Sequence, residues 1–200
     1  MSYNQWAGFA DAVASAALFM STDRTLPVLR SVRVRHDVDR GVNLAEATDR
    51  FTLAEQIFGE DGADPEGWAT FRVDAGDIPT LVRNGDPHDV TVVEDKVTLE
   101  YGNGHSWSLA MPAGDYPQVQ RLWQDAETTD TIGSVAFNPA LLARLAKIAP
   151  YYAGHRSPAA RPLKAHYPVH LEFPDATRPM RATIGDRFRA LIIPVRFGGV

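Results

Sequence analysis

The stretch Glu46-Ala-Thr-Asp-Arg-Phe-Thr-Leu-Ala-Glu-Gln56 (EATDRFTLAEQ) places an aspartate, an arginine and two threonines between apolar residues. Strand-like runs lie on either side of its centre, at Val42–Thr48 and Phe51–Phe58. Thr48-Asp49-Arg50 is therefore either a reactive triplet or a turn that joins two strands. A reactive triplet needs a nucleophile, a base or a metal ligand nearby, so the rest of the chain decides between the two interpretations.

The composition is that of an ordinary globular chain without thiol chemistry. The chain has 200 residues, of which 44% are hydrophobic and 22% charged, enough for one large domain or two small ones. It contains no cysteine, so disulfides and thiolate catalysis are excluded, and a reducing compartment is expected. The apolar N-terminal run has no basic leader and contains Asp11, and no run approaches the ~18 apolar residues of a membrane span. We expect a soluble cytoplasmic protein.

The formal net charge of −5 argues against a general nucleic-acid binder, because phosphate affinity comes from clustered lysine and arginine. The same net charge still allows a protein that gathers its few basic residues on one face.

Hydrophobic periodicity predicts three cycles, each with a helix and several strands. Helices are expected at Asn4–Met20, at Asp77–Asn84 and over the run that begins at Asn138-Pro139, where proline takes the first helical position. Strands are expected at Val28–Arg35, Val42–Thr48, Phe51–Phe58, Trp68–Val73, Val90–Val93, Val97–Tyr101, Ser106–Met111, Ile132–Phe137, Val169–Phe173, Met180–Ile184 and Phe188–Val195. The pattern predicts an α+β protein with three repeated strand–helix–three-strand half-units, although only Ser2–Asn4 could supply the first opening strand. A generic α+β domain without repetition is the alternative.

Five segments, taken in order, resemble the bacterial replicative sliding clamp, the beta subunit of DNA polymerase III. They are Asp23–Val32 (DRTLPVLRSV), Ala47–Ala54 (ATDRFTLA), Pro112–Trp123 (PAGDYPQVQRLW), Phe137–Ile148 (FNPALLARLAKI) and Ala190–Phe197 (ALIIPVRF). The second is similar to the family's Ala-Thr-Asp-x-x-Arg-Leu-Ala signature, but Thr52 stands at the arginine, with Arg50 two places earlier. The last has isoleucine and valine where the family usually has methionines. The resemblance implies the DNA-clamp, or processivity, fold.

The number of half-units per chain implies how many copies of the chain would form a ring. Residues 1–67 and 68–124 resemble the two half-units of a complete clamp domain, and residues 125–200 resemble the second half of the last one. Family chains are longer, with three domains of two half-units each, so this chain looks like a shortened, phage-type member. Family rings enclose duplex DNA with twelve half-units, which implies four copies of this chain in a homotetrameric ring with head-to-tail contacts. A monomeric relative is the alternative.

The resemblance also implies a DNA-facing surface of diffuse positive charge that does not read sequence. The basic residues on or near the predicted helices are Arg24, Arg83, Arg144, Lys147 and Arg156. Arg144 and Lys147 are three residues apart and share a helix face. An ordinary solvated helix face is the alternative for these side chains.

A second implied site is a hydrophobic pocket for short linear peptides of the polymerase and the clamp loader. Carried over by motif, it consists of Leu29, Thr48, Arg50, Phe51, Leu53, Ile192, Ile193, Pro194, Val195 and Arg196. Apolar anchors would fill the pocket, while the turn backbone and an arginine would fix the orientation of the peptide. Strand alternation makes some of the apolar residues plain core instead, and Pro194 is expected at a sheet edge or a bulge.

No motif in the chain supports an enzyme. There is no glycine-rich phosphate loop, nucleophile elbow or HExxH motif, so no catalytic residue and no cofactor is expected. Asp49 is then expected to fix a turn. Two alternatives remain open: a small metal-dependent hydrolase that uses His166, His170 and Glu172, and a clamp-like decoy or adaptor that binds replisome peptides without forming a ring.

Overall fold

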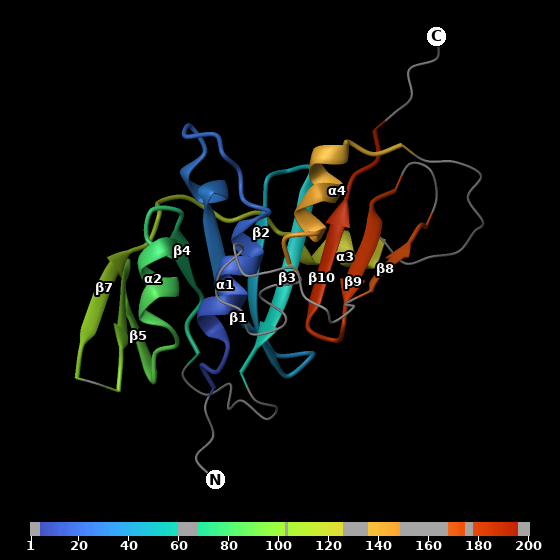
Figure 1. Ribbon diagram of the computed structural model, residues 1–200. Coiled ribbons are helices and arrows are strands. Elements are labelled where there is room, and N and C mark those ends of the chain that lie inside the picture. Colours follow the sequence, from blue (N-terminus) through green and yellow to red (C-terminus); the bar gives the residue numbers. More distant parts are fainter. Residues whose placement is uncertain are drawn as a thin grey trace.

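The computed structural model describes residues 5–59, 68–102, 104–125, 136–148, 168–174 and 178–195 (Figure 1). Its strands form a seven-stranded sheet in the order β4-β1-β2-β3-β10-β9-β8 and a three-stranded sheet in the order β5-β6-β7, and every pairing is antiparallel. The helices are α1 (Phe9–Ala17), α2 (Ile78–Asn84), α3 (Gln120–Asp125) and α4 (Pro139–Leu145), and a 3₁₀ helix, η1, covers Pro27–Arg30. The strands are β1 (Ser31–Asp37), β2 (Val42–Thr48), β3 (Thr52–Phe58), β4 (Phe71–Asp74), β5 (Asp89–Val93), β6 (Lys96–Glu100), β7 (Ser106–Ala110), β8 (Val169–Glu172), β9 (Met180–Ile184) and β10 (Phe188–Ile192).

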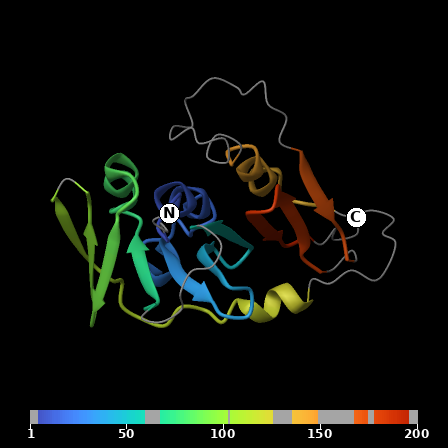
Figure 2. The same ribbon diagram turned by 90° about the horizontal axis from the view of Figure 1, so that it is seen from below.

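Helices α1, α2 and α4 lie on one side of the sheets, while α3 and the extended segment before it cross the other side (Figure 2). A helix followed by three strands occurs three times, as α1 with β1–β3, α2 with β5–β7 and α4 with β8–β10. We call these groups the first, second and third half-units. The mixed architecture confirms the predicted α+β class, and the element order is consistent with three repeats.

The core lies between the helices and the inner faces of the strands. Helix α1 is rich in alanine and packs on β1, β2 and β3, where Ala45, Ala47 and Ala54 are fully buried. Small side chains on both elements allow helix and sheet to approach closely. Phe9 of α1 packs in the core against the rings of Phe58 and Phe71, whose centroids lie 5.3 and 6.1 Å from its own.

The half-units are joined at their borders by antiparallel strand pairing. Strand β4, which precedes α2, pairs with β1 of the first half-unit, with Val32 opposite Val73. Strand β10 of the third half-unit pairs with β3 of the first, from Phe188 opposite Gln56 to Ile192 opposite Thr52. We call the β3–β10 pairing the seam. The first half-unit is therefore the centre of the molecule and contacts both others.

Several predicted elements differ from the structure. The predicted strand Val28–Arg35 begins at Ser31, because Pro27 starts η1 instead. The predicted strand Phe188–Val195 ends at Ile192, since Pro194 lacks the N–H of a ladder residue. The short helix α3 was not predicted. Of the predicted strand Ile132–Phe137, only Ala136 and Phe137 are described, with Ala136 bridging Val195.

The predicted domain limits stay predictions. The first lies at the end of Glu60–Gly67, outside the described residues, as does the opening strand Ser2–Asn4. The limit between residues 124 and 125 falls inside α3.

Candidate peptide groove and DNA-facing surface

The turn between β2 and β3 is held by Asp49. Its Oδ1 accepts hydrogen bonds from the backbone N–H of Phe51 (3.0 Å), the N–H of Thr52 (2.8 Å) and the Thr52 hydroxyl (2.8 Å). Thr48 donates its hydroxyl proton to the carbonyl of Thr52 (2.6 Å). Arg50 takes the left-handed conformation, with φ of 79°. All of these contacts shape a turn, which is the role expected for Asp49.

Arg144 reaches this turn from α4 of the third half-unit. Its Nη1 lies 2.7 Å from Asp49 Oδ2 and 2.8 Å from Thr52 Oγ1, and its guanidinium carbon lies 5.8 Å from the centre of the Phe19 ring. The side chain is only 21% exposed. Helical spacing had suggested an exposed cation beside Lys147, but in the folded chain Arg144 belongs to the turn. No local pattern could have shown a contact across more than ninety residues.

A shallow apolar groove, the Phe51 groove, opens beside the turn. Its lining residues come from the turn and β3, from α3, from the residue before β9 and from the end of β10: Thr48, Arg50, Phe51, Thr52, Leu53, Leu122, Pro179, Leu191 and Ile193. Phe51 is 62% exposed, Leu122 42% and Ile193 40%. Three large apolar side chains thus face solvent around one groove, an arrangement more typical of a binding site than of a plain surface.

The groove contains half of the ten residues expected for the peptide pocket. Thr48, Arg50, Phe51, Leu53 and Ile193 line it. Leu29 and Ile192 are buried core residues instead, because strand alternation turns Ile192 to the helix side and its neighbours Leu191 and Ile193 to the groove. Pro194 and Val195 do not line the groove, and Arg196 lies outside the described residues.

Four lining residues were not predicted: Thr52, Leu122, Pro179 and Leu191. Alternation along β10 could have indicated Leu191 from the position of Ile193. Leu122 and Pro179 reach the groove through tertiary contacts, for which the sequence carries no local signal.

The segment at residues 112–123, which we call the strap, positions Leu122. Tyr116, Val119 and Trp123 pack with Leu53 and Leu191 in a small cluster on the outer face of the sheet. Arg72 of β4 donates hydrogen bonds to the carbonyls of Gly114 (2.8 Å) and Pro112. Burial of the Tyr116 hydroxyl against the sheet raises its pKa. The strap therefore covers the seam and forms one wall of the groove.

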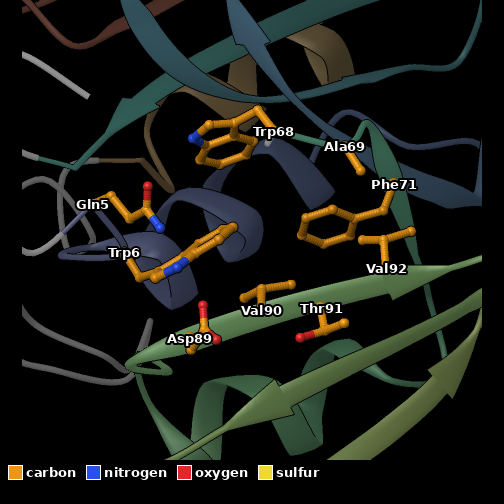
Figure 3. Close-up of a pocket in the computed structure, with 9 residues that line it drawn as sticks. All are labelled: Gln5, Trp6, Trp68, Ala69, Phe71, Asp89, Val90, Thr91 and Val92. Carbon is orange, nitrogen blue, oxygen red and sulfur yellow. The ribbon is translucent and has the colours of Figure 1, made fainter. Parts of the chain in front are cut away.

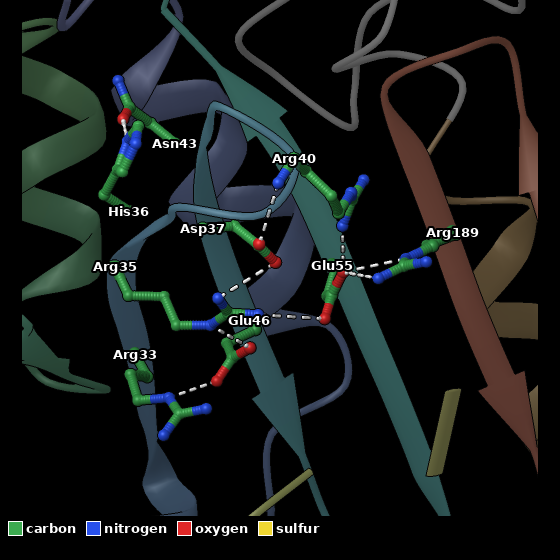
Figure 4. Close-up of polar contacts among 9 residues, drawn as sticks. All are labelled: Arg33, Arg35, His36, Asp37, Arg40, Asn43, Glu46, Glu55 and Arg189. Carbon is green, nitrogen blue, oxygen red and sulfur yellow. Dashed lines mark hydrogen bonds and ion pairs between the residues drawn. The ribbon is translucent and has the colours of Figure 1, made fainter. Parts of the chain in front are cut away.

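A buried ion network lies on the outer face of the sheet, beside the strap (Figure 4). Glu55 of β3 binds Arg40 (3.0 Å) and Arg189 of β10 (2.8 Å), and Arg35 Nη2 lies 3.6 Å from its other oxygen. Glu46 of β2 binds Arg33 and Arg35. Burial raises the pKa of Glu46, and the attraction of Arg33 and Arg35 only partly opposes that rise. The Arg189 guanidinium also lies 4.0 Å from the centre of the Trp123 ring, which links the network to the strap.

A separate cavity of about 370 Å³ lies at the other end of the first half-unit (Figure 3). It is lined by Gln5, Trp6, Trp68, Ala69 and Phe71 and by β5 residues Asp89, Val90, Thr91 and Val92. The Trp6 and Trp68 rings, which both line the cavity, contact each other at 4.7 Å between centroids. It contains none of the residues that the sequence indicated as functional.

The residues expected to face DNA are dispersed. Arg24, Arg83 and Lys147 are exposed, Arg144 is paired with Asp49, and Arg156 lies outside the described residues. Arg83 lies in the last turn of α2 and Lys147 just beyond α4, so both belong to the side of the molecule that carries the helices. Helix α1 contributes no cation.

No group of three potential metal ligands occurs among the described residues. Of the suggested metal set, Glu172 pairs with Arg181 at 3.6 Å, His170 is exposed on β8, and His166 lies outside the described part of the chain. None of the helices in the described part of the chain has the length and apolar character needed to span a bilayer.

Comparison with known proteins agrees with this architecture. Over 135 residues the chain is 27% identical to the beta sliding clamp of Micrococcus luteus; the match covers 65% of this chain and 43% of that protein. The crystal structure of the beta subunit from DNA polymerase of Streptococcus pyogenes matches with a TM-score of 0.65 and 16% identity, over 94% of this chain and 63% of that one. The DNA polymerase sliding clamp from Bacillus subtilis matches with a TM-score of 0.68 and 14% identity, over 98% of this chain and 63% of that one. No protein-family model matches the sequence.

The fold is that of the DNA sliding clamps. In sequence and in fold the chain is similar to the beta sliding clamps, as the sequence motifs had indicated. It spans less than half of the length of the Micrococcus relative and 63% of the two clamp structures.

Proposed function

We propose that this protein is a non-enzymatic processivity factor that encircles duplex DNA and tethers a polymerase through a short linear peptide bound in the Phe51 groove. The observation that carries this proposal is the groove itself. It lies where the Ala47–Ala54 signature meets the C-terminal strand, in a fold shared with sliding clamps.

The groove suits an extended peptide with two or three apolar side chains. Phe51, Leu122 and Ile193 offer apolar surface from three different segments, so a ligand would bury all three at once. The turn beneath is rigid, because Asp49 binds two backbone N–H groups and Arg144. A groove that is already rigid loses little conformational entropy when it binds a ligand, which favours the binding of short peptides.

The side that carries the helices would face the duplex. Arg83 and Lys147 are exposed there, and contacts to phosphate by such residues do not depend on sequence and weaken as salt rises. A few exposed cations of this kind give weak attraction, which suits a ring that slides rather than one that grips. The count of three half-units per chain supports four chains per ring.

The groove is tested by selecting random linear decapeptides on the purified chain. The enriched peptides are then measured by fluorescence anisotropy against Phe51→Ala. We expect the affinity to fall by about tenfold or more, the effect of losing an anchor worth about 1.4 kcal/mol. Val93→Ala is the matched control, because Val93 on β5 is also 62% exposed and lies outside the groove. Equal binding by wild type and Phe51→Ala would refute the peptide site.

Encirclement is tested by retention on a closed circular duplex and its loss when the circle is cut, with the clamp loader present. The double variant Arg83→Glu and Lys147→Glu should shorten retention. Arg121→Glu on α3, on the opposite side of the molecule, is the control and should not. Peptide binding without retention on circles would instead indicate a decoy or adaptor.

A further inference from the structure

A small recess opens on the outer face of the sheet, at the end of the seam away from the Phe51 groove. It has a volume of about 80 Å³, and its polar and charged lining residues are Arg40, Glu55, Thr183, Asp186, Arg187 and Arg189. We call it the arginine pocket. It shares no lining residue with the Phe51 groove, because it lies where Phe188 pairs with Gln56 rather than where Ile192 pairs with Thr52.

The register of β3, β10 and β9 brings their polar side chains to one face in this pocket. Arg189 of β10 lies directly opposite Glu55 of β3 on one side and Thr183 of β9 on the other. Arg187 comes two residues before Arg189, and its carbonyl accepts a hydrogen bond from the N–H of Ile57 (2.7 Å), which continues the β3–β10 ladder. Side chains two positions apart on a strand share a face, so Arg187 and Arg189 lie about 7 Å apart along the same face of the sheet.

Arg40 reaches the pocket from the turn between β1 and β2 and shares one carboxylate oxygen with Arg189 (Figure 4). Arg40 Nη1 lies 3.0 Å from Glu55 Oε2, and Arg189 Nε lies 2.8 Å from the same oxygen. Among the described residues, the bonds to Glu55 use one nitrogen of Arg40 and two of Arg189, so further N–H groups of both side chains remain for another acceptor. The side chain of Arg40 is 32% exposed and that of Arg189 27%, so a ligand in solvent can reach them.

The arginines around Glu55 carry more positive charge than one carboxylate neutralises. Glu55 is buried and also attracts Arg35, whose Nη2 lies 3.6 Å from Oε1. Within the described part of the chain, Arg40 and Arg189 form no ion pair other than the one with Glu55. Burial lowers the pKa of Arg189, the attraction of Glu55 opposes this, and the charge of Arg40 lowers it further. Like charges that share one buried carboxylate repel each other, so the pocket attracts a second anion.

We propose that the arginine pocket binds the phosphate group of a small ligand, either inorganic phosphate or a phosphate monoester. The planar guanidinium group binds phosphate oxygens through paired N–H donors, and Arg40, Arg187 and Arg189 present such groups from two turns and a strand. Thr183 adds a hydroxyl donor on the same face. The pocket is about as large as two or three water molecules in the liquid, so it holds one phosphate group and little else.

The phosphate site goes beyond the proposed function and does not depend on it. The cations proposed to face DNA, Arg83 and Lys147, belong to the side that carries the helices, whereas the arginine pocket lies on the outer face with the ion network. A protein that fails to hold DNA or a peptide would still bind phosphate, and a protein that binds no phosphate would still be able to encircle DNA. The arginines of the pocket come from the first and the third half-units, so a bound phosphate should also stabilise the seam.

Isothermal titration calorimetry of the purified chain with inorganic phosphate, at constant ionic strength, tests the site. We expect wild type to bind phosphate and Arg187→Gln to bind it about tenfold more weakly, the usual effect of losing a charged hydrogen-bond donor. Arg187 is exposed in a turn, so its replacement should leave the fold intact. Arg121→Gln is the matched control, because Arg121 on α3 is also exposed and lies outside the pocket. No binding by wild type, or equal binding by wild type and Arg187→Gln, would overturn the proposal.

A substitution with an effect of the opposite sign tests the charge of the ligand. Asp186→Asn removes an exposed carboxylate from the lining of the pocket and should tighten phosphate binding by about threefold, whereas general damage to the pocket would weaken it. Weaker binding by this variant than by wild type would contradict an anion in the arginine pocket.

Glycerol phosphate and a short DNA duplex distinguish the two sources of a phosphate group. Glycerol phosphate should bind to wild type and lose affinity in Arg187→Gln, as inorganic phosphate does. A duplex that loses affinity in Arg187→Gln, when neither small ligand binds, would overturn the proposal and show a contact with the nucleic-acid backbone instead.

Discussion

The first half-unit is joined to its two neighbours in physically different ways. Its joint with the second half-unit is apolar: Phe9 and Phe71 belong to one continuous core, and α1 packs on α2. Its polar contacts are the backbone pairing of β4 with β1 and a helix cap, in which Asp86 accepts bonds from the N–H groups of Gly8 and Ala10, both at 2.9 Å. Its joint with the third half-unit is the seam, where β3 and β10 are also held by buried ions and by the strap.

The apolar joint mainly stabilises the fold, whereas the seam mainly fixes one arrangement of its strands. Apolar burial stabilises a joint without demanding one arrangement of polar groups. A buried ion network adds little net stability, because removing charges from water costs about as much as their attraction returns. The network does require every charged member to keep its oppositely charged partner, since an uncompensated buried charge is strongly unfavourable. The candidate binding groove lies at the seam, where the register of β10 against β3 positions Leu191 and Ile193 beside the turn.

The apolar joint should be the most sensitive to truncation. Phe9→Ala removes a ring with no exposed surface from contact with Trp6, Phe58 and Phe71. We expect a loss of about 4 kcal/mol in the free energy of unfolding, measured by urea denaturation. Phe51→Ala is the same chemical change at a side chain that is 62% exposed and should stay within about 0.5 kcal/mol. Similar losses in the two variants would contradict the core assignment.

A substitution at the seam should cause the next largest loss of stability. Glu55→Gln removes the carboxylate shared by Arg35, Arg40 and Arg189 and leaves three guanidinium groups around a neutral amide. We expect a loss of about 3 kcal/mol in the free energy of unfolding, the usual result of breaking a buried ion pair from one side. Amide hydrogen exchange should also accelerate in β10 more than in β4, because β10 contributes Arg189 to the network, whereas none of the network's ion pairs comes from β4.

Glu100→Gln is the control for this change. Its side chain is 48% exposed and lies 3.9 Å from His88, a surface contact worth well under about 1 kcal/mol. If exchange in β4 and β10 rises equally in Glu55→Gln, the two joints are not separate in the way described above.

The turn that supports the groove should show a smaller effect. Asp49→Ala removes the acceptor of two backbone N–H groups and the partner of Arg144, for which we expect about 2 kcal/mol of destabilisation. Asp49→Asn retains one side-chain oxygen and should be milder. Both variants should weaken peptide binding in anisotropy measurements, in the same order. A groove that binds equally well in Asp49→Ala would show that the turn does not preorganise it.

Local sequence patterns predicted the local features of this fold. Val42–Thr48 and Met180–Ile184 were predicted with the bounds that the structure has, since alternation and flanking turn residues define such strands. The signature at residues 47–54 supplied the turn and much of one groove wall. These features depend on neighbours in the sequence, which a single sequence displays.

Features that depend on distant contacts could not be predicted in this way. Glu46 and Glu55 lie in strands where alternation suggests an exposed polar face, yet both are buried because the strap covers that face. The pairing of Arg144 with Asp49 likewise links the first and third half-units. Opposite charges on β1, β2 and β3 were the one available signal, since Arg33, Glu46 and Glu55 fall on adjacent positions once the register is known.

The smallest expected effect is a pH dependence within the network. Burial raises the folded-state pKa of Glu46 above its ordinary value of 4.5. Between the two values the folded protein binds more protons than the unfolded chain, so this group's contribution to stability rises as pH falls. That sign is opposite to the behaviour of a surface carboxylate in an ion pair. Glu46→Gln cannot titrate, so the free energy of unfolding of wild type minus that of Glu46→Gln should increase on acidification from neutral pH towards pH 4.5. A difference that decreases over this range would show that Arg33 and Arg35 outweigh the burial of Glu46, and that the outer face of the first half-unit is held by attraction after all.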